Sequence, residues 1–465
     1  MKRYLLFAIV IGTIIFSGCK TFEPEADVTP PLAIPQKFSI DAGINDNVDS
    51  LHLLDGWEEL NSLVNDALIN NFDLKILKAK IEQAKAMVAK EEASFFPDLG
   101  FSIGGQKKGI QVKKSHRQSS KYSDSHSWDG SLRSSYTADV WGEAEAEKQV
   151  KEFNLKAAAF DLEESKLELT TFIAQIWIDI IAVKKKRQIL NSQIKNSKTL
   201  LELQKLRFLN GKANALDVSQ QHEVLAQANS QAPLLEKEER LLFNKLVFLS
   251  GNTLIDAVQV NTEQFPEVIP LPRVGIPLNL LDNRPDIQAA RLRLSSSRWK
   301  ISAARADLLP SFNVTAQALF SSGKLDLLFQ NWVATLAGSL AGPIFDGGFR
   351  KAEIQRVKAA AKEQLNIYAM IVASAIREVE DILISIQKQD AYIKLLVQEL
   401  EAARLTLKDA RIQYQNGQSS YLNYLIAWTS IERLERQLVS ERAVYLKDRI
   451  ELYRVLGVSL KRLTG

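Results

Sequence analysis

Two stretches of the chain pass from a helical pattern through a proline into strict alternation. In ADLLPSFNVTAQALF, residues 306–320, apolar side chains recur at every second position after Pro310, and the positions between them as far as Gln317 are polar but uncharged. The same joint occurs earlier, in EASFFPDLGFSIGG at residues 92–105. A period of two after a proline predicts a half-buried strand that begins where a helix ends.

The repeated joint belongs to a larger duplication. Residues 71–101 align with residues 284–314 at a shift of 213, so that Pro97 matches Pro310. TADVWGE at 137–143 matches GPIFDGG at 342–348 at a shift of 205. FLNGKANALDV at 208–218 matches YQNGQSSYLNY at 414–424 at a shift of 206. The sequence therefore predicts two copies of one unit of roughly two hundred residues.

Each copy is expected to run helix, strand, loop, strand, very long helix, tight turn and long helix. The very long helices are predicted at 143–209 and 349–415, where apolar residues recur in steps of three and four, as in coiled-coil seams. An Asn-Gly pair follows each of them and predicts a helix end. The duplication thus predicts a mainly helical chain with four strands.

The strands have the pattern of outer-membrane strands, with an apolar side and a polar side over about ten residues. Four strands cannot close a barrel, and an open sheet edge is not tolerated in lipid. We therefore expect several copies of the chain to share one barrel. A soluble four-stranded sheet that caps a helical bundle is the alternative.

The first residues read as an export signal. Lys2 and Arg3 precede an apolar run at 4–16, which ends in FSGC with Cys19, the only cysteine of the chain. This arrangement predicts a signal peptide and a lipid on Cys19, and an exported protein with an unmodified cysteine is the alternative. Because Lys20 follows the cysteine where lipoproteins of the inner membrane typically have Asp, we expect the outer membrane.

These patterns divide the chain into five parts. We expect a signal peptide at 1–18, a lipidated extended arm at 19–56, a first repeat at 57–264, a proline-rich linker at 265–282 and a second repeat at 283–465.

Composition narrows the possible functions. Hydrophobic residues make up 46% and charged residues 25% of the chain, which is typical of a folded protein. The mature chain is close to neutral, which gives no electrostatic reason to expect nucleic acid as a partner. The sequence contains no nucleophile elbow, phosphate-binding loop or dinucleotide fingerprint, and no His or Cys cluster with metal-ligand spacing. We expect neither an enzyme nor a cofactor nor a metal site.

Several of these motifs together resemble those of a known family. They are RPDIQAA with the following helix to LLPSF at 284–312, FDGG at 345–348, DVWG at 139–142 and the paired Asn-Gly turns. Over nearly all of the mature chain the sequence resembles the outer membrane efflux proteins, the TolC-like channels, and among them the lipoprotein branch that serves RND-type pumps. The resemblance implies an α+β membrane protein that forms a homotrimer. Each copy would give four strands to a shared twelve-stranded β-barrel and its long helices to an α-helical coiled-coil barrel.

The resemblance also implies a function. The chain would be a passive duct in the outer membrane of a Gram-negative bacterium, in contact with its lipids, through which drugs, toxic compounds or metal ions leave the periplasm. Its partners would be a periplasmic adaptor protein and an inner-membrane RND-type pump. The alternatives are a duct for an ABC-type exporter of proteins or peptides, and a structural periplasmic coiled-coil lipoprotein without a pore.

Three groups of residues are the candidate sites. Pro97 and Pro310 would mark the change from helix to strand, and the return would use Trp141, Gly142, Asp346 and Gly347, with glycine allowing the sharp turn. By the resemblance, the adaptor-docking tips comprise Asn210, Gly211, Leu216, Asp217, Asn416, Gly417 and Leu422. The pore gate would comprise Asn423, Tyr424 and Ile426. The family often has an acidic ring there, whereas Asn423 and Ile426 are neutral, so we expect the gate to close by packing and hydrogen bonds. Plain helix-turn-helix connections are the alternative for the tips.

Overall fold

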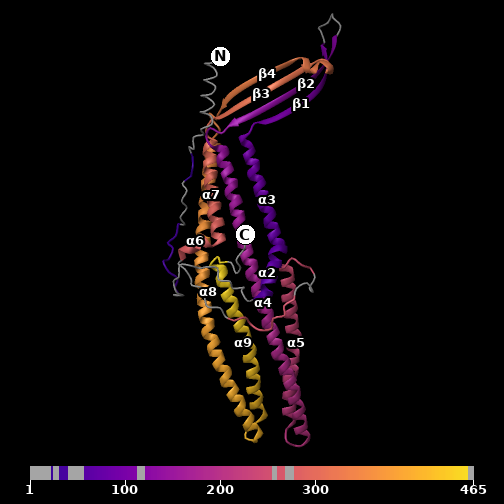
Figure 1. Cartoon of the computed structure of the whole chain (residues 1–465), viewed down its shortest axis with the longest axis vertical. Helices are drawn as coiled ribbons and strands as arrows, with labels where there is room; N and C mark the ends of the chain where they lie inside the picture. The colour runs from indigo at the N-terminus through magenta and orange to yellow at the C-terminus, as the bar shows by residue number, and fades with distance from the viewer. Residues whose placement is uncertain are drawn as a thin grey trace. The chain divides into compact units, whose positions relative to one another are not determined.

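The computed structural model describes residues 22–24, 31–39, 57–112, 121–253, 259–267 and 277–458. The predicted signal peptide and Cys19 lie outside these residues, as do most of the arm and half of the linker. In chain order the principal elements are α2 (Glu58–Asn70), α3 (Phe72–Glu92), β1 (Asp98–Val112), β2 (Lys121–Ala138), α4 (Glu143–Leu209), α5 (Ala215–Leu249), α6 (Leu280–Asn283), α7 (Pro285–Ala306), β3 (Ser311–Ser322), β4 (Trp332–Ala341), α8 (Phe349–Gln415) and α9 (Tyr421–Val455) (Figure 1). None of the helices in the described ranges combines the length and the apolar character that crossing a membrane requires.

The chain forms two compact units, each of which draws on both halves of the sequence. The first consists mainly of Lys80–Ala159 and Ala289–Tyr368 and contains the four strands. The second combines Leu32–Ala79, Phe160–Gln288 and Ala369–Gly465 and contains both turns between long helices. The elements of the two halves are therefore interleaved in space.

The predicted long helices are confirmed. Helices α4 and α8 each contain 67 residues, and α5 and α9 each contain 35. Their seams are apolar and buried, with Ile173, Ile176 and Ile180 on α4 and Val372 and Val379 on α8. Each such side chain stabilises the fold by about 1.5–3 kcal/mol relative to an exposed position. Tertiary burial along the seam thus maintains helices of this length.

Four antiparallel strands lie side by side in the order β1-β2-β3-β4 (Figure 1). The expected length of ten residues is correct for β4 but wrong for the first pair, because β1 has 15 residues and β2 has 18. Pairing continues beyond the alternating segment, through Gln106 opposite Ser127 to Gly109 opposite Asp124. Backbone hydrogen bonds extend the hairpin here without a regular apolar pattern, so periodicity alone could not reveal it.

The strand register confirms that the sheet has one apolar and one polar face. Residues directly opposite each other share a face, and the pairs Phe101–Leu132, Gly130–Phe320 and Phe320–Trp332 belong to the apolar one. The pairs Ser102–Ser131, Arg133–Gln317 and Gln317–Thr335 belong to the other face. Phe101 is 81% exposed, so the apolar face is uncovered in a single chain.

Both halves close their helical hairpins in the same way within the second unit. The Asn71 side-chain amide donates to the Leu249 carbonyl at 2.8 Å, and the Arg284 guanidinium donates to the equivalent Val455 carbonyl at 3.1 Å. A glycine with positive φ then ends each returning helix, Gly251 at 69° and Gly457 at 73°. Both glycines pack on a backbone carbonyl, so no side chain fits there.

We predict that Gly457→Ala destabilises the protein by about 2–4 kcal/mol, because positive φ and steric overlap both oppose the methyl group. A Cβ at this position would lie 2.5 Å from the Asn283 carbonyl oxygen. Gly417→Ala is the matched control, with φ of 71° but open space around the new atom, and should cost only about 1 kcal/mol. Thermal unfolding in detergent measures both variants, and equal losses would contradict the steric argument.

Candidate functional site

The two helix-to-strand joints have the same construction. Pro97 and Pro310 each lie directly before the first residue of a strand, Asp98 and Ser311. Proline has no N–H to continue a helix and fits the first position before a ladder begins. Both prolines thus lie between a helix and a strand, and their role at a membrane boundary stays a prediction.

The return from strand to helix is held by polar contacts. The Trp141 indole N–H donates to the Pro310 carbonyl at 2.7 Å, which links the first return to the second joint. Gly142 and Gly347 have φ of 78° and 64°, as expected for a sharp turn. The Asp346 carboxylate accepts from the backbone N–H groups of Gly348 at 2.9 Å and Arg350 at 3.2 Å, and these bonds lower the pKa of Asp346.

Two contacts at the return were not predicted from sequence. Asp139 accepts from the N–H groups of Ala144 and Glu145 at 3.1 and 2.9 Å, and so satisfies the start of α4 as Asp346 satisfies the start of α8. Arg350 also forms an ion pair with Asp307 at 2.9 Å. The DVWG motif contained a signal for the first contact, since an aspartate just before a helix is a common cap.

The first turn between long helices, which connects α4 to α5, consists of a C-terminal Asn-Gly pair followed by an N-terminal capping box. The Asn210 side chain donates to the Leu206 carbonyl at 2.7 Å, and Gly211 has φ of 68°. Asn214 and Asp217 then form a capping box, with distances of 2.8 and 3.2 Å. Leu216 is exposed beside them. The structure thus brings the four first-tip candidates Asn210, Gly211, Leu216 and Asp217 together on one turn.

The second turn has the same outline without the capping box. Gly417 has φ of 71°, and Ser420 at the start of α9 makes no side-chain cap. Asn416 and Leu422 are exposed on either side of the turn. Both turns lie at the same end of the second unit (Figure 1). All seven predicted docking residues therefore occupy the tips of helical hairpins, and their contact with an adaptor stays a prediction.

The three gate candidates do not share one environment. Asn423 and Ile426 are exposed, and the Asn423 amide donates to the Ser419 hydroxyl at 3.0 Å. Tyr424 is buried instead, with its ring 6.1 Å from that of Tyr414 and 5.9 Å from that of Tyr421. Tyr424 thus stabilises its own hairpin, whereas the other two side chains are available to a partner.

An aromatic cluster behind the second turn was missed at the sequence level. Tyr421 donates its buried hydroxyl to Gln221 on α5, and Gln204 on α4 exchanges hydrogen bonds with Tyr414 at 3.1 and 3.2 Å. Arg207 lies over the Tyr414 ring at 4.7 Å. The cluster joins α4, α5, α8 and α9. Some of its members, such as Gln204 and Tyr414, are 210 positions apart, which is why no local pattern reveals it.

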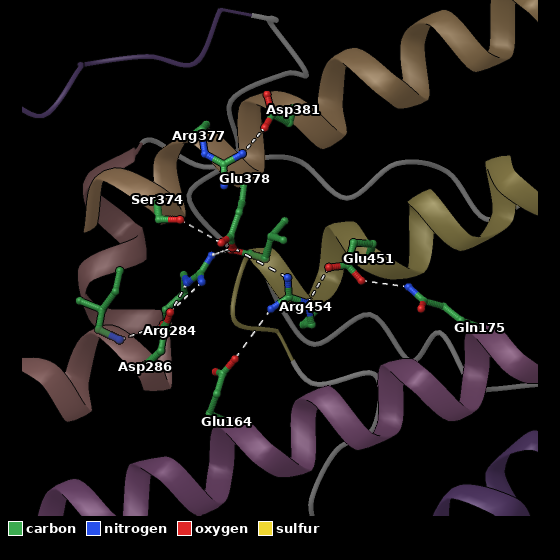
Figure 2. A network of polar contacts seen from close by, with 12 residues as sticks. Glu164, Gln175, Arg284, Asp286, Ser374, Arg377, Glu378, Asp381, Glu451 and Arg454 are labelled. Carbon is green, nitrogen blue, oxygen red and sulfur yellow. Dashed lines mark hydrogen bonds and ion pairs between the residues drawn. The ribbon is translucent and has the colours of Figure 1, made fainter. Parts of the chain in front are cut away.

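A second polar cluster lies where α4, α7, α8 and α9 meet in the second unit (Figure 2). Arg284, only 4% exposed, pairs with Asp286 at 2.7 Å and Glu378 at 3.0 Å. Arg454 pairs with Glu451 at 2.6 Å and lies 3.8 Å from both Glu378 and Glu164. We call these six residues the Arg284 cluster. The motif RPDIQAA contained its first members but gave no sign of the others.

Charge is unbalanced in the Arg284 cluster, because two guanidinium groups face four carboxylates. The pKa of Glu164 is raised to about 7, because burial and the charge of Asp286 both disfavour the carboxylate, while Arg284 and Arg454 oppose the shift. In the described part of the chain, no three His, Cys, Asp or Glu side chains are placed to hold a metal ion.

The sequence and the fold match a known class of channel. The family model for "Outer membrane efflux protein" matches residues 63–252 and 276–458, so the chain belongs to this family. Pyoverdine export outer membrane protein OpmQ of Pseudomonas aeruginosa is 29% identical over 406 residues, which cover 86% of this chain and 85% of OpmQ. Cation efflux system protein CusC of Escherichia coli K12 is 25% identical over 465 residues, covering 98% and 99%.

A solved structure agrees on the fold. The CmeC outer membrane channel of Campylobacter jejuni superposes with a TM-score of 0.86 at 20% identity, covering 96% of each chain. The predicted family and the α+β fold of TolC-like channels are thereby confirmed. Members of the family are outer-membrane channels and transport proteins of efflux systems.

We predict that the free energy of unfolding depends on pH through Glu164, because its pKa is raised in the folded chain. Its pKa is about 7 in the folded chain and near 4.5 when unperturbed, so between these values only the folded state binds the proton. Stability should therefore fall by roughly 3 kcal/mol as the pH rises from about 4.5 to 7. Glu164→Gln should remove this part of the pH dependence.

The measurement is chemical unfolding in detergent at a series of pH values. Other buried carboxyl groups, such as Glu432 and Asp448, also have raised pKa values, so the difference between wild type and variant isolates Glu164. Glu163→Gln, which removes a carboxylate that pairs with Lys166, is the matched control and should leave the slope unchanged. Equal slopes for all three proteins would contradict the prediction.

Proposed function

We propose that this chain is the passive outer-membrane duct of a tripartite efflux system and works as a homotrimer. The observation that carries the proposal is the sheet, which among the described residues has an uncovered apolar face, a polar face and two edge strands, β1 and β4, without a second neighbour. Three copies would place β4 of one chain beside β1 of the next and give twelve strands without an edge. The apolar face would meet lipid and the polar face would line the pore.

The proposed cargo is small molecules, whether drugs, toxic compounds or metal ions. The polar face contains mainly hydroxyl and amide groups, such as Ser102, Ser131, Thr315 and Gln317. Such a wall hydrates a passing solute without selecting strongly for charge. The relatives agree with a broad range, since one is named for pyoverdine export and another for cation efflux. The inner-membrane pump would then choose the cargo and supply the work.

The proposed partners meet the chain at the tips. Asn210, Gly211, Leu216 and Asp217 on one turn, and Asn416, Gly417 and Leu422 on the other, would dock a periplasmic adaptor that connects to an RND-type pump. Asn423 and Ile426 would close the pore between copies, while Tyr424 holds the hairpin that presents them. A lipid on Cys19, at the start of the arm 19–56, would anchor the chain in the outer membrane.

We predict that cross-linking in intact cells, followed by pull-down of the tagged chain and mass spectrometry, recovers an adaptor and an RND-type pump. The double variant Leu216→Asp and Leu422→Asp should lose both, because two charges would enter the docking surface. Leu395→Asp is the matched control, since it places a charge on an exposed position of α8 far from the tips and should keep both partners.

Two other results would change the proposal. Recovery of an ABC-type exporter would replace small molecules by proteins or peptides as cargo. A chain that runs as a monomer in detergent and recovers only structural envelope proteins would contradict the duct and favour a coiled-coil spacer.

A further inference from the structure

The Arg284 cluster contains a contact that the internal duplication should repeat. Glu164 on α4 belongs to the first half of the sequence, whereas Arg454 on α9 and Glu378 on α8 belong to the second (Figure 2). The contact between Glu164 and Arg454 therefore runs from a first half to a second half within one chain. In a ring of several copies, first and second halves alternate. The second half of one copy must therefore also contact the first half of the next copy.

The equivalent positions follow from the equal helix lengths. Because α4 and α8 have 67 residues each and α5 and α9 have 35 each, positions correspond at a constant shift of 206. At the positions equivalent to Glu164, Glu378 and Arg454, the other half has Met370, Phe172 and Phe248. All three ionic members are thus replaced by large apolar side chains.

These apolar side chains are uncovered in a single chain. Met370 and Phe248 are each 65% exposed and Phe172 is 50% exposed, whereas the side chains of Glu164 and Arg454 are each only 19% exposed. The ionic version of the contact is formed inside the chain, and the apolar version has its two sides open to solvent. Solvation of such residues is unfavourable, so the two sides need a partner.

Further exposed apolar side chains lie along α5 and α8. On α5, Leu234, Leu241 and Phe248 recur at a spacing of seven and are all more than half exposed. The α9 equivalent of Leu241 is Lys447, which contacts Asp179 on α4 at 2.8 Å. On the other side, Ile178 of α4 is fully buried, whereas its equivalent Ile384 on α8 is exposed. Glu164, Arg454, Lys447 and Ile178 of the internal contact thus all have exposed apolar counterparts.

We infer that Met370 and Ile384 of one copy pack on Phe172, Leu241 and Phe248 of the next copy. The occupant is a second copy of this chain because the same surfaces, one repeat apart, already contact each other within the chain. Such a head-to-tail contact uses different surfaces on the two partners and repeats until the ring closes. The inference rests on the proposed oligomeric duct and assigns the residues that join its subunits.

Charges beside the apolar residues fit the same arrangement. Within the chain, the Gln175 amide donates to Glu451 at 2.9 Å. The equivalents are Asp381 on α8 and Lys245 on α5, which have opposite charges and are both exposed. Asp381 pairs with Arg377 on its own helix at 2.6 Å, which holds its carboxylate at the surface. An ion pair between Asp381 of one copy and Lys245 of the next would fix the orientation of the contact.

The test is cysteine cross-linking in the full-length lipoprotein, purified in detergent. The double variant Met370→Cys and Phe248→Cys, treated with a short bifunctional thiol reagent, should give a ladder that ends at the trimer on a denaturing gel. Each single variant should give no ladder, which excludes coupling through Cys19. The double variant Glu164→Cys and Arg454→Cys is the matched control and should be joined within one chain, without higher bands.

The outcomes separate this inference from the proposed function. A trimer by native mass spectrometry that gives no ladder would overturn the contact and leave the duct proposal standing. A monomer without a ladder would overturn both. As a second measurement, Lys245→Asp should lower the assembled fraction at limiting concentration several-fold, and adding Asp381→Lys should restore it. A double variant that assembles no better than Lys245→Asp alone would contradict the ion pair.

Discussion

The two edge strands of the sheet, β1 and β4, are the constraint on which the rest of the structure depends, because among the described residues each pairs with a neighbour on one side only. The sheet has its apolar face uncovered, and its edge strands present N–H and C=O groups that neither water nor another strand would satisfy in lipid. Each unsatisfied group costs several kcal/mol in an apolar medium, so a row of them exceeds the net stability of an ordinary domain. For the proposed duct, a single chain could not place this sheet in a membrane, and the long helices would have to hold several copies together.

Much of this architecture could be predicted from the sequence, for identifiable reasons. Helices α4 and α8 begin and end where expected because their seams are long and periodic and an Asn-Gly pair follows each one. The joints at Pro97 and Pro310 were found because proline excludes the continuation of a helix. The lengths of β1 and β2 could not be predicted, because the outer parts of these strands are rich in glycine and serine and pair through the backbone alone. The clusters around Arg284 and Tyr421 were not found either, because their members meet only when four helices pack.

The Arg284 cluster shows what is required to bury charged side chains where four helices pack together. Burying a guanidinium costs several kcal/mol of solvation, which the cluster offsets with Asp286, Glu378 and the Val455 carbonyl. The first half closes the same hairpin with Asn71, a neutral amide that needs no counter-charge. The ionic version therefore adds little stability over the neutral one. Its advantage is selectivity, because only a surface that supplies carboxylates at these positions can complete it.

This selectivity would determine which surfaces of the chain contact each other and which contact another copy. If Met370 of another copy entered the place of Glu164, it would bring no carboxylate to Arg454 and would cover charged groups with an apolar side chain, which is unfavourable. If Glu164 entered the apolar surface around Phe248, its carboxylate would be buried without a guanidinium. Each mismatch is penalised, so the ionic surfaces select the internal contact and the apolar surfaces select the neighbouring copy. The difference between two otherwise equivalent contacts would thus allow a duplicated chain to distinguish its internal contact from the contact with another copy.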